Sequence, residues 1–158
     1  MDIYIIKNNP LTTTIIFYID DPECRYVQGE DVLLSNDHRS QVLQFCGHDP
    51  ICRKFNSPEA LQRAKENVEK FYKVVGITEN INMTLQVLEH EMPEYFEGGS
   101  HIYHTDEEVK NFRMKNAYKL PVSDEVMSIV RQNFTQEIEF YNFCKQRLLN
   151  QYENITKP

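Results

Sequence analysis

The chain has 158 residues, a formal net charge of −7 and 41% hydrophobic residues. This length suits one domain, and the hydrophobic content excludes general disorder because it is sufficient for a core. The negative charge argues against a nucleic-acid partner, since nucleic-acid recognition needs a basic surface. No apolar run approaches the roughly 18 residues of a membrane span.

The first 19 residues form a segment that we set apart from residues 20–158. β-Branched and aromatic residues predict strands at 4–6 and 12–19. The sequence NNP between them predicts a turn, so a small hairpin is expected here. The segment lacks the basic start, continuous apolar run and cleavage site of a signal peptide. If the protein is secretory, we therefore expect its targeting segment outside this sequence, which would make the chain a fragment.

Four helices and one strand are predicted after a long polar loop at residues 20–45. Ser57 is the predicted N-cap of the first helix, with Pro58 at the first helical position. The apolar run VVGI at 74–77 is typical of a buried strand. The other helices are predicted to start after Thr78, after Ser123 and at about Thr135, the last reaching about Tyr152. The predicted apolar stripes of the four helices, in chain order, are Leu61, Ala64, Val68, Phe71 and Val75; Ile81, Leu85, Leu88 and Met92; Val126, Ile129 and Val130; and Ile138, Tyr141, Leu148 and Tyr152.

Two of the four cysteines are close in the sequence. Cys46 and Cys52 flank a glycine and a proline, which favour a turn tight enough for a disulfide. Free thiols remain an alternative, as does a zinc site completed by His38, His48 and Cys24, although no paired metal-ligand spacing is present. Cys24 and Cys144 have no obvious partner by spacing, and Cys144 is expected to be a buried free thiol.

Three sequons provide N-glycosylation acceptors at Asn82, Asn133 and Asn154. Each could be unused. Together with the predicted disulfide they favour a protein of the secretory pathway, because disulfides persist in oxidising compartments.

Positive charge concentrates in residues 101–121 of this otherwise acidic chain. Arg113, Asn116 and Lys119 are three residues apart, so a helical turn would place them on one face. With Lys110 and Lys115 they could bind sulfate, phosphate or carboxylate groups, the alternative being a solvated loop with surface ion pairs. The sequence contains neither a glycine-rich phosphate loop nor a nucleophile elbow.

Several blocks of the chain resemble the carboxyl half of the uronosyl 2-O-sulfotransferases, the heparan sulfate, dermatan/chondroitin and Pipe-like enzymes. The resemblance extends from about residue 21 to residue 152. Two of its blocks, QFCGH followed by Cys52 and VGITE, are specific when they occur together. The blocks are QFCGH at 44–48 followed by Cys52, AL at 60–61 with AKEN at 64–67, VGITE at 75–79, LE at 88–89, PEYF at 93–96, LP at 120–121 and EFYNF at 139–143.

The resemblance implies an α/β fold, here the carboxyl-terminal half of a P-loop-like sulfotransferase, predominantly helical with few short strands. It implies a Golgi type II membrane enzyme that transfers sulfuryl from 3′-phosphoadenosine 5′-phosphosulfate to the 2-hydroxyl of a uronic acid in a glycosaminoglycan, without a metal. Arg113 falls where the family has a basic residue near the substrate. Lys115 and Asn116 fall near the nucleotide, where Lys119 is also expected to bind.

Some parts of the family pattern have no counterpart here. The phosphosulfate loop and the catalytic histidine of the family lie upstream of the matched region, and residues 1–19 do not resemble them. The family commonly has a second cysteine shortly after the position of Cys24, and this chain has none there.

The sequence therefore predicts the carboxyl-terminal segment of a glycosaminoglycan 2-O-sulfotransferase that is inactive alone. It carries no predicted catalytic residue, so enzyme activity of this chain stays uncertain. The alternatives are a non-catalytic glycan-binding module or pseudoenzyme and a truncated product without a function of its own. The acceptor polysaccharide and the oligomeric state are open, a homo-oligomer being one of the alternatives.

Overall fold

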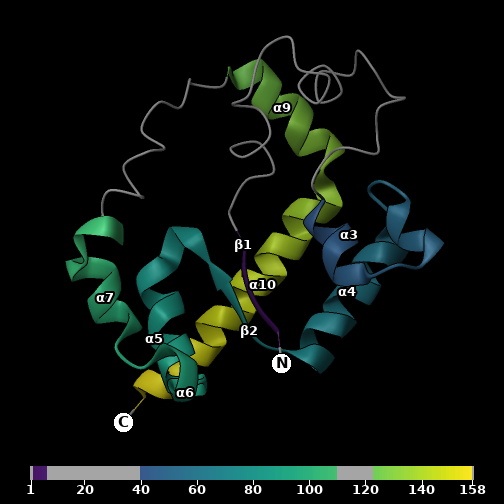
Figure 1. Ribbon diagram of the computed structural model, residues 1–158. Helices are drawn as coiled ribbons and strands as arrows, with labels where there is room; N and C mark the ends of the chain where they lie inside the picture. Colours follow the sequence, from purple (N-terminus) through teal and green to yellow (C-terminus); the bar gives the residue numbers. More distant parts are fainter. Residues whose placement is uncertain (1, 7–39, 110–122, 158) are drawn as a thin grey trace.

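The computed structural model of the protein describes residues 2–6, 40–109 and 123–157. Helices surround a pair of short parallel strands, β1 (Asp2–Ile6) and β2 (Tyr72–Ile77) (Figure 1). The predicted combination of many helices with few short strands is therefore confirmed. The helices are α3 (Gln41–Cys46), α4 (Pro58–Phe71), α5 (Ile81–Glu91), α6 (Pro93–Phe96), α7 (Gly99–Thr105), α9 (Asp124–Asn133) and α10 (Thr135–Thr156), with 3-10 turns η2 (Pro50–Arg53) and η3 (Thr78–Asn80).

The first strand pairs with a distant segment of the chain. β1 lies parallel to β2, with Tyr4 opposite Val75 and Ile6 opposite Ile77. The predicted strand at 4–6 is thus confirmed, and among the described residues its partner is β2. Residues 12–19 lie outside the described residues. A parallel pair needs a crossover connection, and α3 and α4 lie in it.

The second strand is the centre of the core. Val74 and Val75 point to opposite faces and are 0% and 1% exposed, so both faces of β2 are covered. Helices α4, α5 and α10 all contact this strand. This confirms the prediction of a buried parallel strand between two helices. The core residues that the helices supply include Ala64 and Val68, Val87 and Leu88, and Phe140, Cys144 and Leu148.

The predicted start of α4 is confirmed in detail. The Ser57 hydroxyl accepts from Ala60 N at 3.3 Å, and Pro58 is the first helical residue. The helix after β2 starts later than predicted, because Thr78 begins the 3-10 turn η3 and Asn80 precedes α5. The hydroxyl that hydrogen-bonds the end of β2 belongs to Thr84. It accepts from Ile77 N at 2.9 Å and donates to Ile77 O at 3.0 Å.

Three short helices were not predicted. Residues 41–46 were expected in a loop but form α3, and α6 and α7 lie where Pro93, Gly98 and Gly99 were expected to break the chain. Proline at the first position of α6 is compatible with a helix because its missing N–H is not needed there. Gly98 is in the left-handed region with φ 77°, which lets the chain turn into α7.

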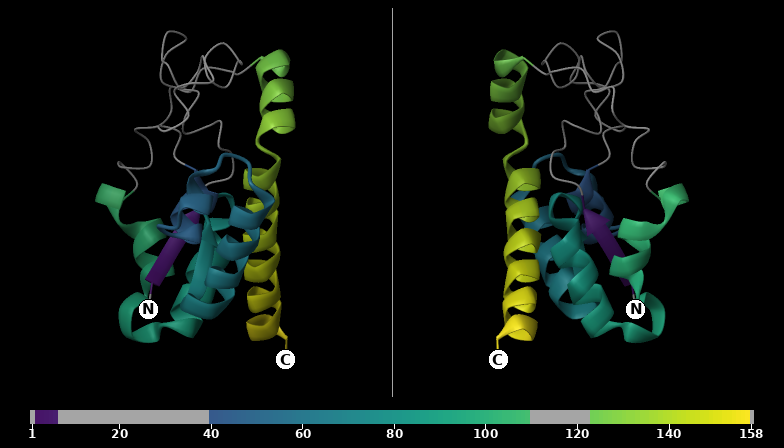
Figure 2. Two further views of the ribbon diagram at one scale, coloured as in Figure 1. Left: turned by 90° about the vertical axis from the view of Figure 1, so that its right-hand side faces the viewer. Right: turned by 90° about the vertical axis from the view of Figure 1, so that its left-hand side faces the viewer.

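The last helix forms one side of the molecule. α10 packs along the sheet and α9 continues beyond it, so that the two lie nearly end to end (Figure 2). Of its predicted stripe, Tyr141 and Leu148 are buried, whereas Ile138 and Tyr152 are only half-buried. Cys144 is a buried free thiol as predicted, and burial raises its pKa to about 12. None of the helices in the described part of the chain is both long and apolar enough to cross a membrane.

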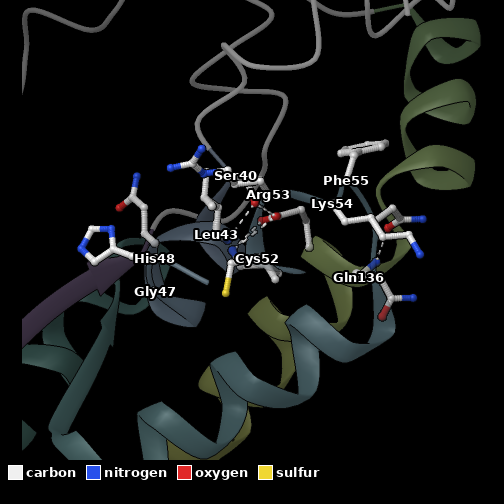
Figure 3. A pocket seen from close by; sticks show the side chains of 13 residues that line it. Ser40, Leu43, Gly47, His48, Cys52, Arg53, Lys54, Phe55 and Gln136 are labelled. Atoms are coloured by element: carbon white, nitrogen blue, oxygen red, sulfur yellow. Dashed lines mark hydrogen bonds between the residues drawn. The ribbon is translucent and has the colours of Figure 1, made fainter. Parts of the chain in front are cut away.

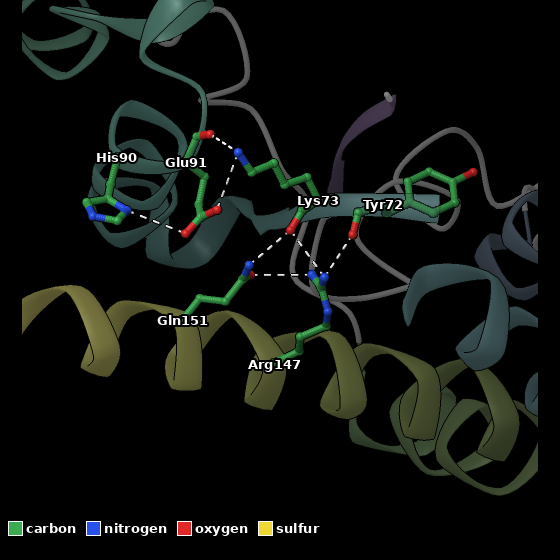
Figure 4. Close-up of polar contacts among 6 residues, drawn as sticks. All are labelled: Tyr72, Lys73, His90, Glu91, Arg147 and Gln151. Atoms are coloured by element: carbon green, nitrogen blue, oxygen red, sulfur yellow. Dashed lines mark hydrogen bonds and ion pairs between the residues drawn. The ribbon is translucent and has the colours of Figure 1, made fainter. Parts of the chain in front are cut away.

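Side chains of α10 also hydrogen-bond the backbone of β2. Arg147 donates to the carbonyls of Tyr72 and Lys73 at 2.8 and 3.2 Å, and Gln151 donates to the carbonyl of Lys73 at 2.9 Å (Figure 4). Lys73 in turn pairs with the Glu91 carboxylate at 3.6 Å. Buried backbone carbonyls need donors, and here a helix provides them to a strand.

Candidate functional site

A disulfide closes the loop between α3 and η2. Cys46 and Cys52 are bonded, with their Cα atoms 5.6 Å apart. Gly47 has φ 103° and donates to Leu43 O at 3.2 Å, which ends the helix. The predicted disulfide is confirmed, and the free-thiol and zinc alternatives for this pair are wrong. The described residues contain no group of three or more His, Cys, Asp or Glu side chains that could hold a metal ion.

A buried carboxylate from the last helix fixes the start of this loop region. Glu137 is 6% exposed and accepts from the Ser40 hydroxyl and, at 3.0 and 3.3 Å, from the backbone N–H groups of Gln41 and Val42. These N–H groups belong to the first turn of α3, where backbone N–H groups have no carbonyl partner within the helix. Burial raises the pKa of Glu137, and the hydrogen bonds oppose that shift.

The start of α10 is fixed by the same loop in return. Asn56, at φ 52°, accepts from Gln136 N at 2.9 Å and donates to the Thr135 hydroxyl at 3.0 Å. Phe134, which precedes the helix, has no side-chain capping bond. Each of the two helices is therefore capped by a residue distant in sequence, and the loop at 47–56 is held between them.

A pocket of about 540 Å³ lies between this loop and the amino-terminal ends of α3 and α10 (Figure 3). Its lining includes Ser40 and Glu137 near the helix starts and His48, Arg53, Lys54 and Phe55 from the loop. In the view of Figure 3, His48 lies on the opposite side of the pocket from Lys54 and Phe55. This volume is within the roughly 300–1,000 Å³ that small-ligand pockets have.

The charges of this pocket are mostly positive. Arg53 and Lys54 are exposed, and neither forms an ion pair with any carboxylate in the described residues. Asp49, in the same loop, is instead paired with Arg63 at 2.6 Å, which holds its pKa below the ordinary value. The Glu137 carboxylate faces three donors of its own. The site can therefore attract an anionic group.

A second region of interest is the carboxyl end of β2, where α/β folds commonly bind ligands. Glu79 in η3 lies here beside Tyr141, whose hydroxyl is buried and makes no hydrogen bond of normal geometry to the described residues. Burial, and then the Glu79 carboxylate, raises the pKa of Tyr141 to about 12. Gly76 lies within the strand, so no glycine-rich turn with a lysine follows β2. These residues do not fit the phosphate groups of a nucleotide.

The predicted ligand-binding residues Arg113, Lys115, Asn116 and Lys119 lie outside the described residues, as do Cys24 and His38. The structure therefore does not test their predicted roles.

The predicted glycosylation residues Asn82, Asn133 and Asn154 are all exposed. The hydroxyl of Thr84, in the first sequon, is buried and hydrogen-bonded to the backbone of Ile77. The Asn82 side-chain oxygen is hydrogen-bonded to His104 Nε2 at 2.8 Å. Modification of Asn82 is consequently expected only before the chain folds, because an oligosaccharide-transferring enzyme must reach both side chains.

The sequence did not single out the pocket. The adjacent cations Arg53 and Lys54 follow Cys52 directly, and this run of charge next to a constrained loop was the only signal for it. Nothing local in the sequence connects Glu137 or Gln136 to that loop, since more than 75 residues separate them.

In the described residues, helices surround a parallel strand pair, a cationic pocket lies beside the disulfide, and β2 is not followed by a phosphate-binding turn. No known family model matches the chain. It is 44% identical over 137 residues to the uronyl 2-sulfotransferase homolog pip of Drosophila melanogaster, over 86% of this chain and 27% of that protein. It is 38% identical over 132 residues to the human uronyl 2-sulfotransferase, over 82% of this chain and 32% of that protein.

A third relative is the heparan sulfate 2-O-sulfotransferase hst-2 of Caenorhabditis elegans, 34% identical over 106 residues that cover 65% of this chain and 32% of that protein. The chain belongs to the uronyl and heparan sulfate 2-O-sulfotransferase family, as the resemblance in its sequence implied. It spans about a third or less of the length of these relatives.

Proposed function

We propose that this chain is the carboxyl-terminal part of a glycosaminoglycan 2-O-sulfotransferase. The complete enzyme transfers sulfuryl from 3′-phosphoadenosine 5′-phosphosulfate to the 2-hydroxyl of a uronic acid. The observation that carries the proposal is the 44% identity over 137 residues to the Pipe homolog. The disulfide and the exposed sequon asparagines support a lumenal location in the Golgi, with the parent enzyme anchored in the membrane.

In this proposal the chain contributes one wall of the site and does not hold the donor phosphates. The turn after β2 carries Glu79 and no lysine, and a carboxylate there repels phosphate. Phosphoryl and sulfuryl donors are commonly held by backbone N–H groups at a helix start. The residues that hold the phosphate groups of the donor and deprotonate the sugar hydroxyl therefore belong to the rest of the enzyme.

The wall would contact both the nucleotide and the polysaccharide. Arg113 is proposed to contact the acidic sugar, and Lys115, Asn116 and Lys119 to contact the nucleotide, on the strength of the family resemblance. Arginine is suited to the first role because its planar guanidinium can bind a carboxylate or sulfate through two hydrogen bonds.

A transfer assay tests this function. The chain is incubated with radiolabelled 3′-phosphoadenosine 5′-phosphosulfate and either desulfated heparan or dermatan, beside a longer protein that includes the upstream coding region. We expect transfer by the longer protein and none above background by the chain alone, because positioning the donor can lower the barrier by about 7–11 kcal/mol. Transfer by the chain alone would show that the donor site is misassigned.

Substitution in the longer protein tests the role of the wall. Arg113→Ala is expected to raise KM for the polysaccharide, whereas Lys145→Ala, an exposed cation on α10, serves as the matched control. Glycan binding without turnover in the longer protein would favour the alternative of a non-catalytic glycan-binding module, for which the cationic pocket is the supporting observation.

A further inference from the structure

The pocket beside the disulfide presents two adjacent cations in a fixed place. Arg53 directly follows the bonded Cys52 and ends η2, and Lys54 is the next residue. Lys54 N donates to Ile51 O at 3.1 Å, and Asp49 caps the turn by accepting from Ile51 N at 3.0 Å. The backbone that carries both cations is thus held by a covalent bond and by hydrogen bonds, which lowers the entropy lost when they bind a ligand.

Both cations are exposed. Neither is used in an ion pair with the described residues, whereas Arg63 and Lys65, which are close in sequence, are paired with Asp49 and Glu139. Lys54 lies close enough to Glu59 to lower its pKa slightly, but the Ser57 hydroxyl is the main cause of that shift. An arginine next to a lysine combines a planar two-point donor with a flexible point charge, which suits sulfate and carboxylate groups.

An aromatic ring lies beside them. Phe55 is half-buried, and its ring contacts Phe134 edge-on with the centroids 5.1 Å apart. A sugar ring presents C–H groups with partial positive charge, which are attracted to the negative face of an aromatic ring. The amide of Gln136, on the same side of the pocket in Figure 3, adds a donor and an acceptor for hydroxyl groups.

We propose that this pocket is a contact site for an acidic polysaccharide, in which Arg53 and Lys54 bind a sulfate or carboxylate group while a sugar ring lies against Phe55. The inference rests on the proposed function, since it takes its substrate class from there. It adds a second place of contact, on residues other than those of segment 101–121. Two contacts on one polysaccharide chain act as linked sites, so longer oligosaccharides should bind more tightly than short ones.

The opposing charges do not cancel this attraction. The net charge of the chain is −7, but its effect on a distant anion is screened beyond about 8 Å at physiological salt. The one carboxylate among the described residues that line the pocket belongs to Glu137, which faces the Ser40 hydroxyl and two backbone N–H groups. Those donors compensate its charge at the place where the ligand would bind.

Binding to size-defined oligosaccharides tests the inference. Affinities of the chain for a heparin octasaccharide, a heparin disaccharide and neutral dextran are measured by titration calorimetry at two salt concentrations. We expect the octasaccharide to bind most tightly, more weakly at higher salt, and dextran not to bind. Arg53→Ala/Lys54→Ala should weaken octasaccharide binding roughly tenfold, because two charge-assisted contacts are lost.

A matched variant separates the pocket from the overall charge. Lys70→Ala/Lys145→Ala also removes two exposed cations, from α4 and α10, and should change the affinity less than about twofold. Both variants must keep the disulfide and the circular dichroism of the wild type. Equal weakening by both pairs would overturn the inference, because it would show that only overall charge matters.

Lysine labelling gives a readout that needs no variant. Bound octasaccharide should protect Lys54 from acetylation and leave Lys145 as reactive as in the free chain. Unchanged labelling of Lys54 at saturating octasaccharide would overturn the proposed contact, as would the absence of any octasaccharide binding. The function proposed above would stand in either case if the longer protein transfers sulfuryl, so the two proposals fail separately.

Discussion

Ser40 and Glu137, which are 97 residues apart, together satisfy the amino-terminal end of one short helix. The Ser40 hydroxyl accepts from Leu43 N at 3.0 Å and donates to the Glu137 carboxylate, which itself accepts from Gln41 N and Val42 N. Residues 41–46 are thereby held as a helix by a side chain of α10. This contact joins the cationic loop to the core of the molecule.

We predict that the protonation of Glu137 changes stability with pH. Burial raises its folded-state pKa above the ordinary 4.5, so the folded chain holds this proton at pH values where the unfolded chain has lost it. The stability that comes from this group is complete below the unfolded pKa and is lost as pH rises through the raised folded pKa. The advantage of the wild type over Glu137→Gln should therefore shrink as pH rises above 4.5 and through the raised pKa of Glu137.

Urea unfolding of both proteins across this pH range measures the difference. Glu139→Gln, on the same helix but exposed, is the matched control and should not change the slope. A wild type whose advantage over Glu137→Gln grows with pH would contradict the prediction.

Reduction of the disulfide should lower the free energy of unfolding by about 2 kcal/mol. The bond between Cys46 and Cys52 closes a short loop, and a short loop restricts the unfolded chain only modestly. Urea unfolding with and without a reductant measures this, and Cys46→Ser/Cys52→Ser should be insensitive to the reductant. Recovery of both residues as alkylated thiols from secreted protein would refute the bond.

Loss of the Thr84 hydroxyl should destabilise the fold by roughly 1–3 kcal/mol. Thr84→Val keeps the shape of the side chain but removes both hydrogen bonds to the Ile77 backbone, which is buried. Asn82→Gln destroys the same sequon without touching these bonds, and should stay within about 0.5 kcal/mol of the wild type. Thermal unfolding of unglycosylated protein separates the two effects, and equal losses in both variants would argue against a structural role of the hydroxyl.

Arg147 should contribute to stability through the backbone of β2. Arg147→Met keeps most of the apolar stem and removes the donors to the carbonyls of Tyr72 and Lys73, for a loss of roughly 1–3 kcal/mol. Lys145→Met, two residues earlier and exposed, should have little effect. Chemical denaturation compares them, and the prediction does not survive an Arg147→Met variant as stable as the wild type.

Local interactions explain the elements that were predicted correctly. The Ser57 cap of α4 and the turn between Cys46 and Cys52 each involve residues within one or two turns of the chain. The apolar run at 74–77 is buried on both faces because parallel strands are covered by helices on both sides. Patterns of this kind can be read from neighbouring residues alone, and the family could be recognised from short blocks for the same reason.

Contacts over long sequence distances decided the rest. The region of α3 was expected to be loop because residues 20–45 are polar. Six residues are too few to form a stable helix alone, and the side chain that holds α3 comes from Glu137. β1 pairs with a strand more than 60 residues away, so its partner could not be inferred from the nearby turn residues. The sequence by itself determined the family, the disulfide and the main helices. Only the tertiary structure placed Arg53 and Lys54 at a pocket with Gln136, because Glu137 of α10 caps α3 there and Asn56 of the loop caps α10.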